Sequence, residues 1–206
     1  MSKIIGSVCK LCRREHTKLF LKGSRCFTDK CSFDRRSYPP GQHGQSRMKF
    51  SEFALQLREK QKVRRYYGVF EKQFRKMFKI ADGRKGETGF NLLQALELRL
   101  DSVVYNMGFA ESRRQAKQLI AHKHFAVNGK RVSIPSMALK LGDVIEVLEK
   151  STEKTPIMAG KELAKTREVP AWVEVDGNKG TIKDLPTREQ ISLQVEENMI
   201  VEYYSR

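Results

Sequence analysis

The chain has 206 residues, of which 40 are lysine or arginine and 24 are acidic, giving a formal net charge of +16. No apolar run approaches the roughly 18 residues that a membrane span needs, so the composition predicts a globular protein that does not enter a membrane. The first residues are soon followed by polar and charged ones and lack the apolar core of a signal peptide, so we expect a cytoplasmic location.

The positive charge is concentrated in two segments. Residues 1–80 carry 21 lysines and arginines against six acidic residues, and residues 111–131 carry six against one. Concentrated basic charge indicates a polyanionic partner. Nucleic acid fits this pattern better than a membrane surface, because the sequence offers no basic amphipathic helix with a clean apolar face. We therefore expect a nucleic-acid-binding protein rather than one that merely happens to be basic.

All four cysteines lie near the start, at Cys9, Cys12, Cys26 and Cys31. Two close pairs joined by thirteen residues are the spacing of a closed four-thiolate metal site. Zinc is the expected occupant, and an iron–sulfur cluster uses the same ligand count. Ligation would stabilise a basic, loop-rich segment that is too small to bury a core of its own. His16, between the two pairs, is interpreted as a surface or RNA-facing residue rather than a ligand.

A rigid turn and two helices follow the cysteines. Pro39-Pro40-Gly41 indicates a turn, and Ser51 is placed to cap the helix after it. Apolar residues at helical spacings predict helix over 51–80, broken into two by Tyr66-Tyr67-Gly68. The glycine-rich stretch 81–89 reads as a loop.

The next segment predicts a long amphipathic helix and then a short capped one. From Phe90 to Met107 the apolar residues fall on one stripe, and Gly108 is placed to end that helix. Ser112-Arg-Arg-Gln115 has the spacing of a capping box, so Ser112 is expected as the N-cap of a second helix.

The rest of the chain favours strands. Residues 125–134 alternate around Asn128-Gly129, which is the signal of a tight hairpin, and 141–147 reads as a turn into another strand. A short helix is expected around 159–165, a second hairpin over 172–182 and a closing strand over 199–204. Trp172 is expected to pack in a hydrophobic core.

Together these elements predict an α+β, mainly helical fold with three parts. The first is a basic four-cysteine metal-binding arm over 1–44, called the N-terminal arm below. The second is a helical domain with C-terminal strands, over 45–92 plus 170–206. The third, over 93–169, is a small inserted module of two helices and a hairpin.

Two groups of motifs carry a family resemblance. Residues 99–120 together with 127–132 resemble the small RNA-binding module named after ribosomal protein four of the small subunit. Residues 36–44, 67–75 and 197–204, among others, resemble the bacterial form of that ribosomal protein family over essentially the whole chain. The resemblance implies a structural protein without a catalytic site. It would bind 16S rRNA early in assembly, nucleate folding of the 5′ domain and influence decoding accuracy.

The same resemblance implies neighbours on the ribosome and one local departure. The partners would be 16S rRNA, small-subunit proteins including number five, and messenger RNA near the place where it enters the subunit, with no membrane partner. The family usually has glycine between two histidines where this chain has His122-Lys123-His124. Glycine would suit a left-handed turn there, so Lys123 leaves the local conformation to be determined.

Duplex RNA is read mostly through its shape, phosphates and 2′-hydroxyls, so clustered cations on a rigid surface are the expected contacts. The residues assigned to RNA are Arg13, Arg14, Lys18, Lys22, Arg25, Arg35, Arg36, Tyr38, His43 and Arg47 in and after the N-terminal arm; Lys62, Arg64, Arg65, Lys72, Arg75 and Lys76 in the helices; and Arg113, Arg114, Lys117, His122, Lys123, His124, Lys130 and Arg131 in the module. Arg113, Arg114 and Lys117 are expected on the exposed side of their helix.

Two alternatives from other classes remain open at this point. An RNA-modifying enzyme can carry the same small module, but it needs a full catalytic domain with an essential aspartate, and the rest of this chain is short and basic. A zinc-dependent regulator that binds DNA would need a recognition helix and usually a dimerisation surface, and neither stands out. Competition between RNA and DNA, and an assay for RNA modification, separate these readings.

Overall fold

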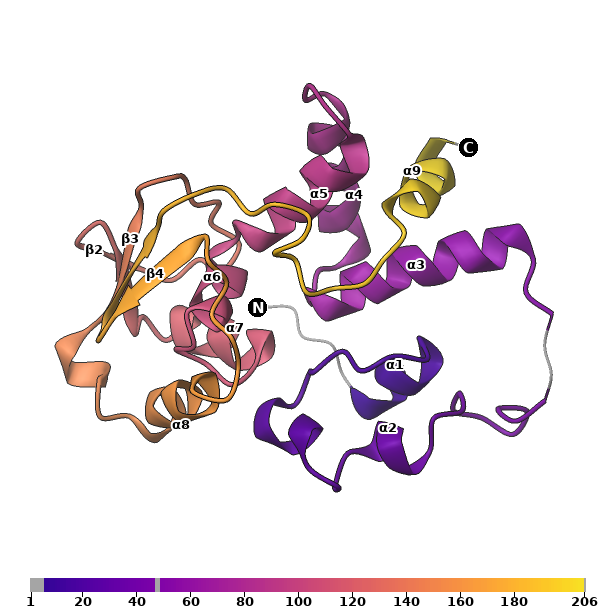
Figure 1. Cartoon of the computed structure of the whole chain (residues 1–206), viewed down its shortest axis with the longest axis horizontal. Helices are drawn as coiled ribbons and strands as arrows, with labels where there is room; N and C mark the ends of the chain where they lie inside the picture. Colours follow the sequence, from indigo (N-terminus) through magenta and orange to yellow (C-terminus); the bar gives the residue numbers. More distant parts are fainter. Residues whose placement is uncertain (1–5, 47–48, 206) are drawn as a thin grey trace. The chain divides into compact units, whose positions relative to one another are not determined.

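The structure is a computed structural model that describes residues 6–46 and 49–205 (Figure 1). The chain forms two compact units. Unit 1 consists of Met1–Phe90 together with Leu193–Arg206, within the described ranges, and unit 2 consists of Asn91–Ser192. Helix α5 (Thr88–Glu97) begins in the first unit and ends in the second. The mixture of helices and a small sheet agrees with the predicted α+β class.

The N-terminal arm in unit 1 contains only short helical turns. These are α1 (Cys9–Arg14), the 3-10 turn η1 (Gly23–Phe27) and α2 (Ser32–Arg35). The turn predicted at Pro39-Pro40-Gly41 is confirmed. Arg13 braces it, because its Nε donates to the Tyr38 carbonyl at 2.9 Å and its guanidinium lies 5.0 Å from the centre of the Tyr38 ring.

Helices α3 (Glu52–Tyr66) and α4 (Glu71–Asp82) confirm the predicted pair and its break. Ser51 caps α3 by accepting the Ala54 N–H at 3.3 Å. The helix ends where Gly68 takes φ +61, a left-handed conformation that favours glycine. The Gly68 N–H then bonds Arg65 O and the Val69 N–H bonds Arg64 O, which is the Schellman pattern of helix termination.

The predicted closing strand at 199–204 is wrong, because this segment lies in helix α9 (Glu197–Ser205). Its aromatic and β-branched residues favour a strand locally, but the contacts follow a helical period. Ile200 is buried, and Tyr204, four residues on, places its ring 4.6 Å from that of Phe78. The Tyr204 hydroxyl also donates to Glu71 Oε1 at 2.8 Å, so packing within unit 1 overrides local propensity.

The single helix predicted over 90–107 is in fact two. Helix α5 ends at Glu97 and α6 spans Leu100–Asn106, with Arg99 extended between them at ψ 140°. The first N–H groups of α6 bond to the chain around residue 136: Leu100 N–H to Met137 O at 2.9 Å and Asp101 N–H to Pro135 O at 3.1 Å. A tertiary contact therefore begins α6, which a local pattern does not reveal. Gly108, at φ +80, follows the end of α6 as predicted.

Helix α7 (Arg113–Ala121) begins as the capping pattern predicts. The Ser112 hydroxyl accepts the Gln115 N–H at 3.3 Å. The Gln115 side chain reaches back to the N–H of Glu111 at 2.6 Å, one residue before the usual partner in a capping box.

The strands of unit 2 form one antiparallel sheet in the order β2-β1-β3-β5-β4. Asn128 and Gly129 both have positive φ, as the predicted tight hairpin requires. The ranges are β1 (Phe125–Val127), β2 (Lys130–Val132), β3 (Val144–Val147), β4 (Val173–Asp176) and β5 (Lys179–Ile182). Between β3 and β4 lie η2 (Glu149–Ser151) and α8 (Thr155–Ala164), the latter longer than the helix expected there.

The second hairpin corrects the expected assignment of the C-terminal strands to the helical domain. Strand β5 pairs with β3, with Val144 opposite Thr181, so β4 and β5 extend the sheet of the RNA-binding module. Helices α6 and α7 lie against this sheet (Figure 1). The core between them includes Leu100, Ile120, Phe125 and Trp172, each at most 1% exposed, which confirms Trp172 as a packing residue. Full burial of each such aliphatic or aromatic side chain contributes about 1.5–3 kcal/mol.

Candidate RNA-binding surface

Helix α4 presents four cations on one exposed stripe. Lys72, Arg75 and Lys76 were predicted to contact RNA, and Lys79 joins them at the same helical spacing. All four are exposed, while Phe74 and Phe78 on the opposite side are buried. Within the described part of the chain, no acidic side chain pairs with any of the four. The stripe, called the α4 stripe below, therefore keeps its full charge for a polyanion.

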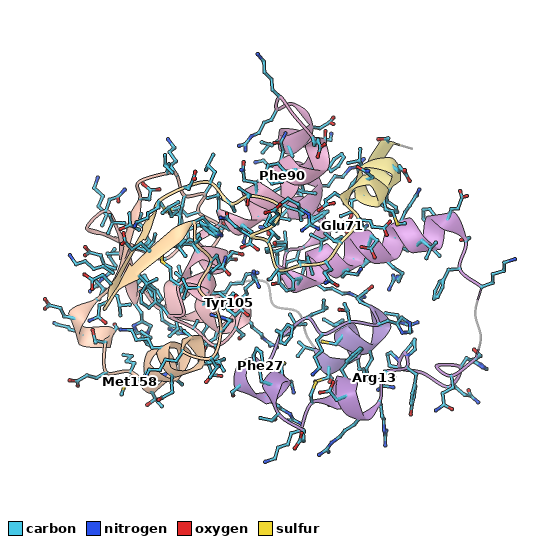
Figure 2. The ribbon with its side chains drawn as sticks, viewed as in Figure 1. Arg13, Phe27, Glu71, Phe90, Tyr105 and Met158 are labelled. Atoms are coloured by element: carbon cyan, nitrogen blue, oxygen red, sulfur yellow. The ribbon has the colours of Figure 1, made fainter. Side chains whose placement is uncertain are left out.

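Several predicted cations of the N-terminal arm are held in place by hydrogen bonds. Arg25 Nε donates to Lys30 O at 3.3 Å and Arg35 Nε to Asp29 O at 3.1 Å, while Lys18 pairs with Asp34 at 2.6 Å. Tyr38 and Lys18 are partly exposed. The fully exposed members are Arg14, Lys22, Arg25, Arg35, Arg36 and His43. The arm thus offers cations held in place by hydrogen bonds to its own backbone; Figure 2 labels Arg13 within it. Arg47 lies outside the described residues.

A buried carboxylate joins the arm to α3. Glu15, at the end of α1, accepts hydrogen bonds from Arg58 at 3.4 Å and from Arg65, and its side chain is fully buried. Burial raises the pKa of Glu15, although the two arginines act to lower it. Burial also disfavours the charged form of Arg65 and so lowers its pKa. Two other predicted cations are also paired, Lys62 with Glu59 and Arg64 with Glu71. Arg65 and these two therefore act first as structural residues.

The four thiols sit on the short helical turns of the arm. Cys9 and Cys12 lie one turn apart on α1, Cys26 lies in η1 and Cys31 is the N-cap of α2. Cys12 and Cys31 are buried and the other two are partly exposed. The Lys22 N–H donates to Cys26 Sγ at 3.4 Å, an interaction that favours a thiolate. The donor set suits zinc, yet within residues 6–46 and 49–205 no three Cys, His, Asp or Glu side chains are grouped as closely as a metal ion requires.

The thiols nevertheless lie within range of one another's charge. Burial raises the pKa of Cys12 to about 11, and Cys26, Cys9 and Cys31 add to the increase. Burial also raises the pKa of Cys26, with Cys31 and Cys9 among the contributors. His16 is exposed, in agreement with its interpretation as a surface residue.

In unit 2 the exposed predicted residues lie on α7, at its C-terminal end and on the first hairpin. They are Arg114, His122, Lys123, Lys130 and Arg131. The expected exposure of Arg113 is wrong, because its side chain is only 8% exposed and pairs with Glu97 at 3.2 Å. Lys117 is partly buried and lies 3.5 Å from Asp101. Burial lowers the pKa of Lys117, with Asp101 acting against that change.

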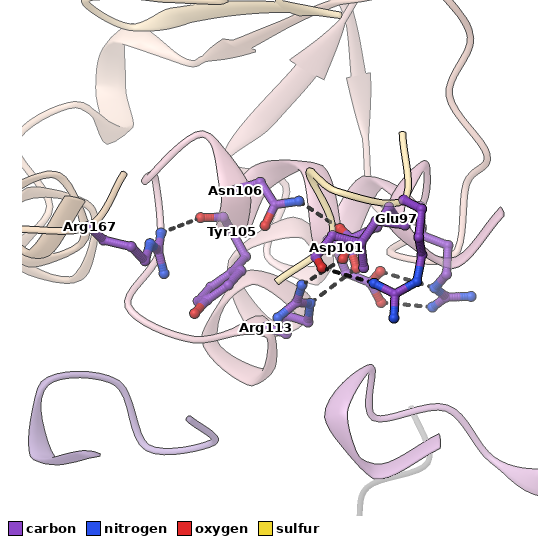
Figure 3. A network of polar contacts seen from close by, with 10 residues as sticks. Glu97, Asp101, Tyr105, Asn106, Arg113 and Arg167 are labelled. Carbon is purple, nitrogen blue, oxygen red and sulfur yellow. Dashed lines mark hydrogen bonds and ion pairs between the residues drawn. The ribbon is translucent and has the colours of Figure 1, made fainter. Parts of the chain in front are cut away.

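Arg113 and Lys117 belong to a buried polar network that ties α7 to α6 (Figure 3). Arg99 bonds both carboxylate oxygens of Asp101, at 3.1 and 2.7 Å. Arg113 Nε donates to Ser102 Oγ at 3.2 Å, and Asn106 donates to Glu97 at 2.7 Å. The charge pattern of the sequence does not show whether an arginine side chain points into the core or toward solvent. Arg113 was therefore assigned to RNA. This cluster of side chains is called the Glu97–Asp101 network below.

A Schellman motif ends α7 and fixes the backbone conformation at Lys123, the position where the family usually has glycine. The Lys123 N–H bonds Ile120 O at 2.8 Å and the His124 N–H bonds Leu119 O at 3.2 Å. Lys123 takes φ +60, so it adopts the left-handed conformation in which glycine would be expected. His124 then turns inward, with Nδ1 2.9 Å from Ser151 Oγ, and burial lowers its pKa.

Replacing Lys123 by glycine is expected to raise the free energy of unfolding by about 0.5–1 kcal/mol, because glycine relieves the left-handed strain, partly offset by its greater freedom in the unfolded chain. Urea unfolding followed by fluorescence of Trp172 measures this. Lys123→Ala is the matched control, since it removes the same charge and keeps the strain. An equal gain in both variants would assign the effect to charge instead.

Comparisons with known proteins identify the family of the chain. Residues 3–97 match the family model described as ribosomal protein S4/S9 N-terminal domain, and residues 98–145 match the S4 domain. The chain is 63% identical over its whole length to small ribosomal subunit protein uS4A of Bdellovibrio bacteriovorus. It is 58% and 56% identical to the uS4 proteins of Desulforapulum autotrophicum and Acetivibrio thermocellus, again over the full length of both chains.

The chain belongs to the uS4 family. Members of this family are structural ribosomal proteins and not enzymes, so the interpretation as an RNA-modifying enzyme is not favoured. The boundary between the two matched models, at 97/98, falls where α5 gives way to the extended Arg99. In the described part of the chain, no helix combines the length and the apolar character that crossing a membrane demands.

Sequence reasoning missed Lys79, an exposed cation of the α4 stripe, and Arg58, which pairs with the buried Glu15. Lys79 lies three and seven residues after Lys76 and Lys72, so the period of the α4 stripe could have found it. Arg58 lies four and seven residues before Lys62 and Arg65 on α3, which is a comparable signal.

Proposed function

We propose that this uS4-family chain is a primary 16S rRNA-binding protein of the cytoplasmic small ribosomal subunit, which nucleates assembly of the 5′ domain and contributes to decoding accuracy. The observation that carries the RNA-binding part is the α4 stripe, in which four exposed cations stand on a rigid helix without acidic partners. Further exposed cations lie on the N-terminal arm of unit 1 and, separately, on α7 of unit 2. Full-length identity to proteins named uS4 supports the ribosomal assignment.

The proposal extends to neighbours of the protein on the subunit. We infer contacts with small-subunit protein five and with messenger RNA near the point where it enters, since the family resemblance implies both.

Equilibrium binding to a 5′-domain fragment of 16S rRNA, against an unrelated structured RNA of equal length, tests the RNA-binding proposal across a salt series. We expect the 5′-domain fragment to bind about 100-fold or more tightly and to stay ahead at high salt. Specific recognition depends on more than charge, whereas purely electrostatic binding weakens equally for both RNAs. Equal affinities that fall together with salt would refute the proposal.

We further propose that Cys9, Cys12, Cys26 and Cys31 hold one structural zinc ion. The support is the donor set itself: two close pairs on helical turns of one small segment, with two of the thiols buried. A closed four-sulfur site would supply cross-links between α1, η1 and α2 that their short lengths do not provide. An iron–sulfur cluster would use the same ligands.

Metal content tests this directly. The reduced, purified protein is expected to contain about one zinc ion per chain, and a strong chelator should make the N-terminal arm sensitive to protease while unit 2 keeps its Trp172 fluorescence. Cys12→Ser should lose the metal, whereas His16→Gln, the control, should retain it. Absence of both zinc and iron from protein that still has an ordered arm would contradict the assignment, and visible absorbance would indicate a cluster.

A further inference from the structure

Unit 1 contains a cavity of about 300 Å³ lined by the N-terminal arm, the segment before α3, and the middle and last turn of α3. Its lining residues are Arg14, His16, Pro39, Phe50, Arg58 and Arg65. A cavity of this size lies at the small end of the range that holds small organic ligands. The lining therefore combines arginine and histidine side chains with an aromatic ring and a proline.

The arginines of the lining outnumber the carboxylates that pair with them. Glu15 accepts hydrogen bonds from both Arg58 and Arg65, so one carboxylate serves two guanidinium groups. Arg14 is exposed and donates only to the Pro40 carbonyl, at 3.3 Å, a neutral partner. Burial lowers the pKa of Arg65, Glu15 acts to raise it, and repulsion from Arg58, Arg64 and Arg14 lowers it further. An anion in the cavity would relieve that repulsion, and guanidinium groups bind phosphate in a bidentate manner.

The two apolar residues of the lining, Phe50 and Pro39, suit the flat ring of a nucleotide base. Phe50 is 46% exposed just before α3, and Pro39 belongs to the turn that Arg13 braces. Unpaired RNA bases leave their stack and lie on aromatic side chains, an interaction that tolerates any base. A phosphate beside a flat aromatic ring is the combination that one nucleotide presents.

His16, one of the lining residues, directly follows the C-cap of α1. It takes φ +52, and the Thr17 N–H bonds Cys12 O at 3.3 Å across the end of the helix. The end of α1 therefore fixes the backbone position from which the His16 side chain projects. The exposed imidazole adds a donor or acceptor that can meet a base edge or a 2′-hydroxyl.

We propose that this cavity receives a single unpaired nucleotide of the bound RNA, with its phosphate on Arg14, Arg58 and Arg65 and its base against Phe50. The inference rests on the proposed rRNA-binding function and deepens it. The α4 stripe contacts the phosphate backbone of any RNA, whereas the cavity favours an RNA helix that contains an unpaired nucleotide. It therefore gives unit 1 a preference for irregular RNA that charge alone does not confer.

The test compares two short RNA duplexes that differ only by a one-nucleotide bulge. Wild-type protein is expected to bind the bulged duplex about 10-fold more tightly, and Phe50→Ala should abolish that preference without weakening binding to the regular duplex. Leu55→Ala, a similarly exposed apolar residue on α3, is the control that keeps the preference. Arg14→Gln should weaken binding to the bulged duplex more than Arg84→Gln, which removes an exposed charge elsewhere in unit 1.

Two results separate this inference from the proposed function. A wild-type protein that prefers the 5′-domain fragment but does not distinguish the bulged duplex, or a Phe50→Ala variant that retains the distinction, would overturn the inference alone. Failure to discriminate the 5′-domain fragment from unrelated RNA would instead overturn the proposed function. Because Phe50 and Arg14 are both exposed, circular dichroism of these variants is expected to match that of the wild type.

Discussion

Replacing Asp101 by alanine is expected to lower the free energy of unfolding of unit 2 by about 3–5 kcal/mol, the cost of leaving buried charges without their partner. Asp101 is fully buried and accepts two hydrogen bonds from Arg99, with Lys117 3.5 Å away. The Arg99 side chain is only 7% exposed, so it would remain buried without its partner. Urea unfolding followed by fluorescence of Trp172 reports on unit 2, since Trp172 is buried there and is the single tryptophan.

The matched control for Asp101 is Glu168→Ala, which removes one negative charge from an exposed position of unit 2. Its free energy of unfolding should stay within about 0.5 kcal/mol of the wild-type value, as for most surface substitutions. If Asp101→Ala also changed stability by less than about 1 kcal/mol, the Glu97–Asp101 network would not be the element that fixes α7.

Neutralising the α4 stripe is expected to weaken RNA binding about 100-fold near physiological salt and to reduce the log–log salt slope by about 3, because each neutralised phosphate contributes about 0.7–0.9. The variant changes four exposed residues to glutamine: Lys72, Arg75, Lys76 and Lys79. Glutamine is close to lysine and arginine in helix propensity, so α4 should remain folded. Binding of the 5′-domain fragment over a salt series measures both quantities.

The control for the α4 stripe replaces the same number of exposed lysines in unit 2 that were not assigned to RNA: Lys140, Lys150, Lys165 and Lys183. Their loss should change the salt slope by less than 1. Equal effects of the two quadruple variants would mean that net charge, and not the position of the cations, determines RNA binding.

The fold followed from the sequence wherever a local signal sets the structure. Ser51, Gly68, Ser112 and Asn128-Gly129 act through caps and turns, and each lies where it was expected. The errors came from contacts between distant residues. The break at Arg99 depends on hydrogen bonds to the chain near residue 136, and α9 forms because Tyr204 packs on Phe78 and bonds to Glu71.

The same division applies to the RNA-binding surface. Lys72, Arg75 and Lys76 could be assigned to the RNA-binding surface from the sequence, because the helical period places them opposite the apolar residues of α4. Arg113 and Arg114 are adjacent and chemically identical, yet only the structure shows that Glu97 holds the first. The cavity near Phe50 could not be anticipated, because its walls come from three separate segments of unit 1.

The division of the chain also sets an order of folding during synthesis. Unit 2 is one continuous segment, complete at Ser192, whereas unit 1 needs Leu193–Arg206 to return to its first ninety residues. Domains fold as units while the chain emerges. The RNA-binding module can therefore close first, while the aromatic cluster around Phe78 waits for Tyr204. A nascent chain would then hold a folded unit 2 and an unfinished unit 1. Shortening α9 would destabilise unit 1 and leave unit 2 intact.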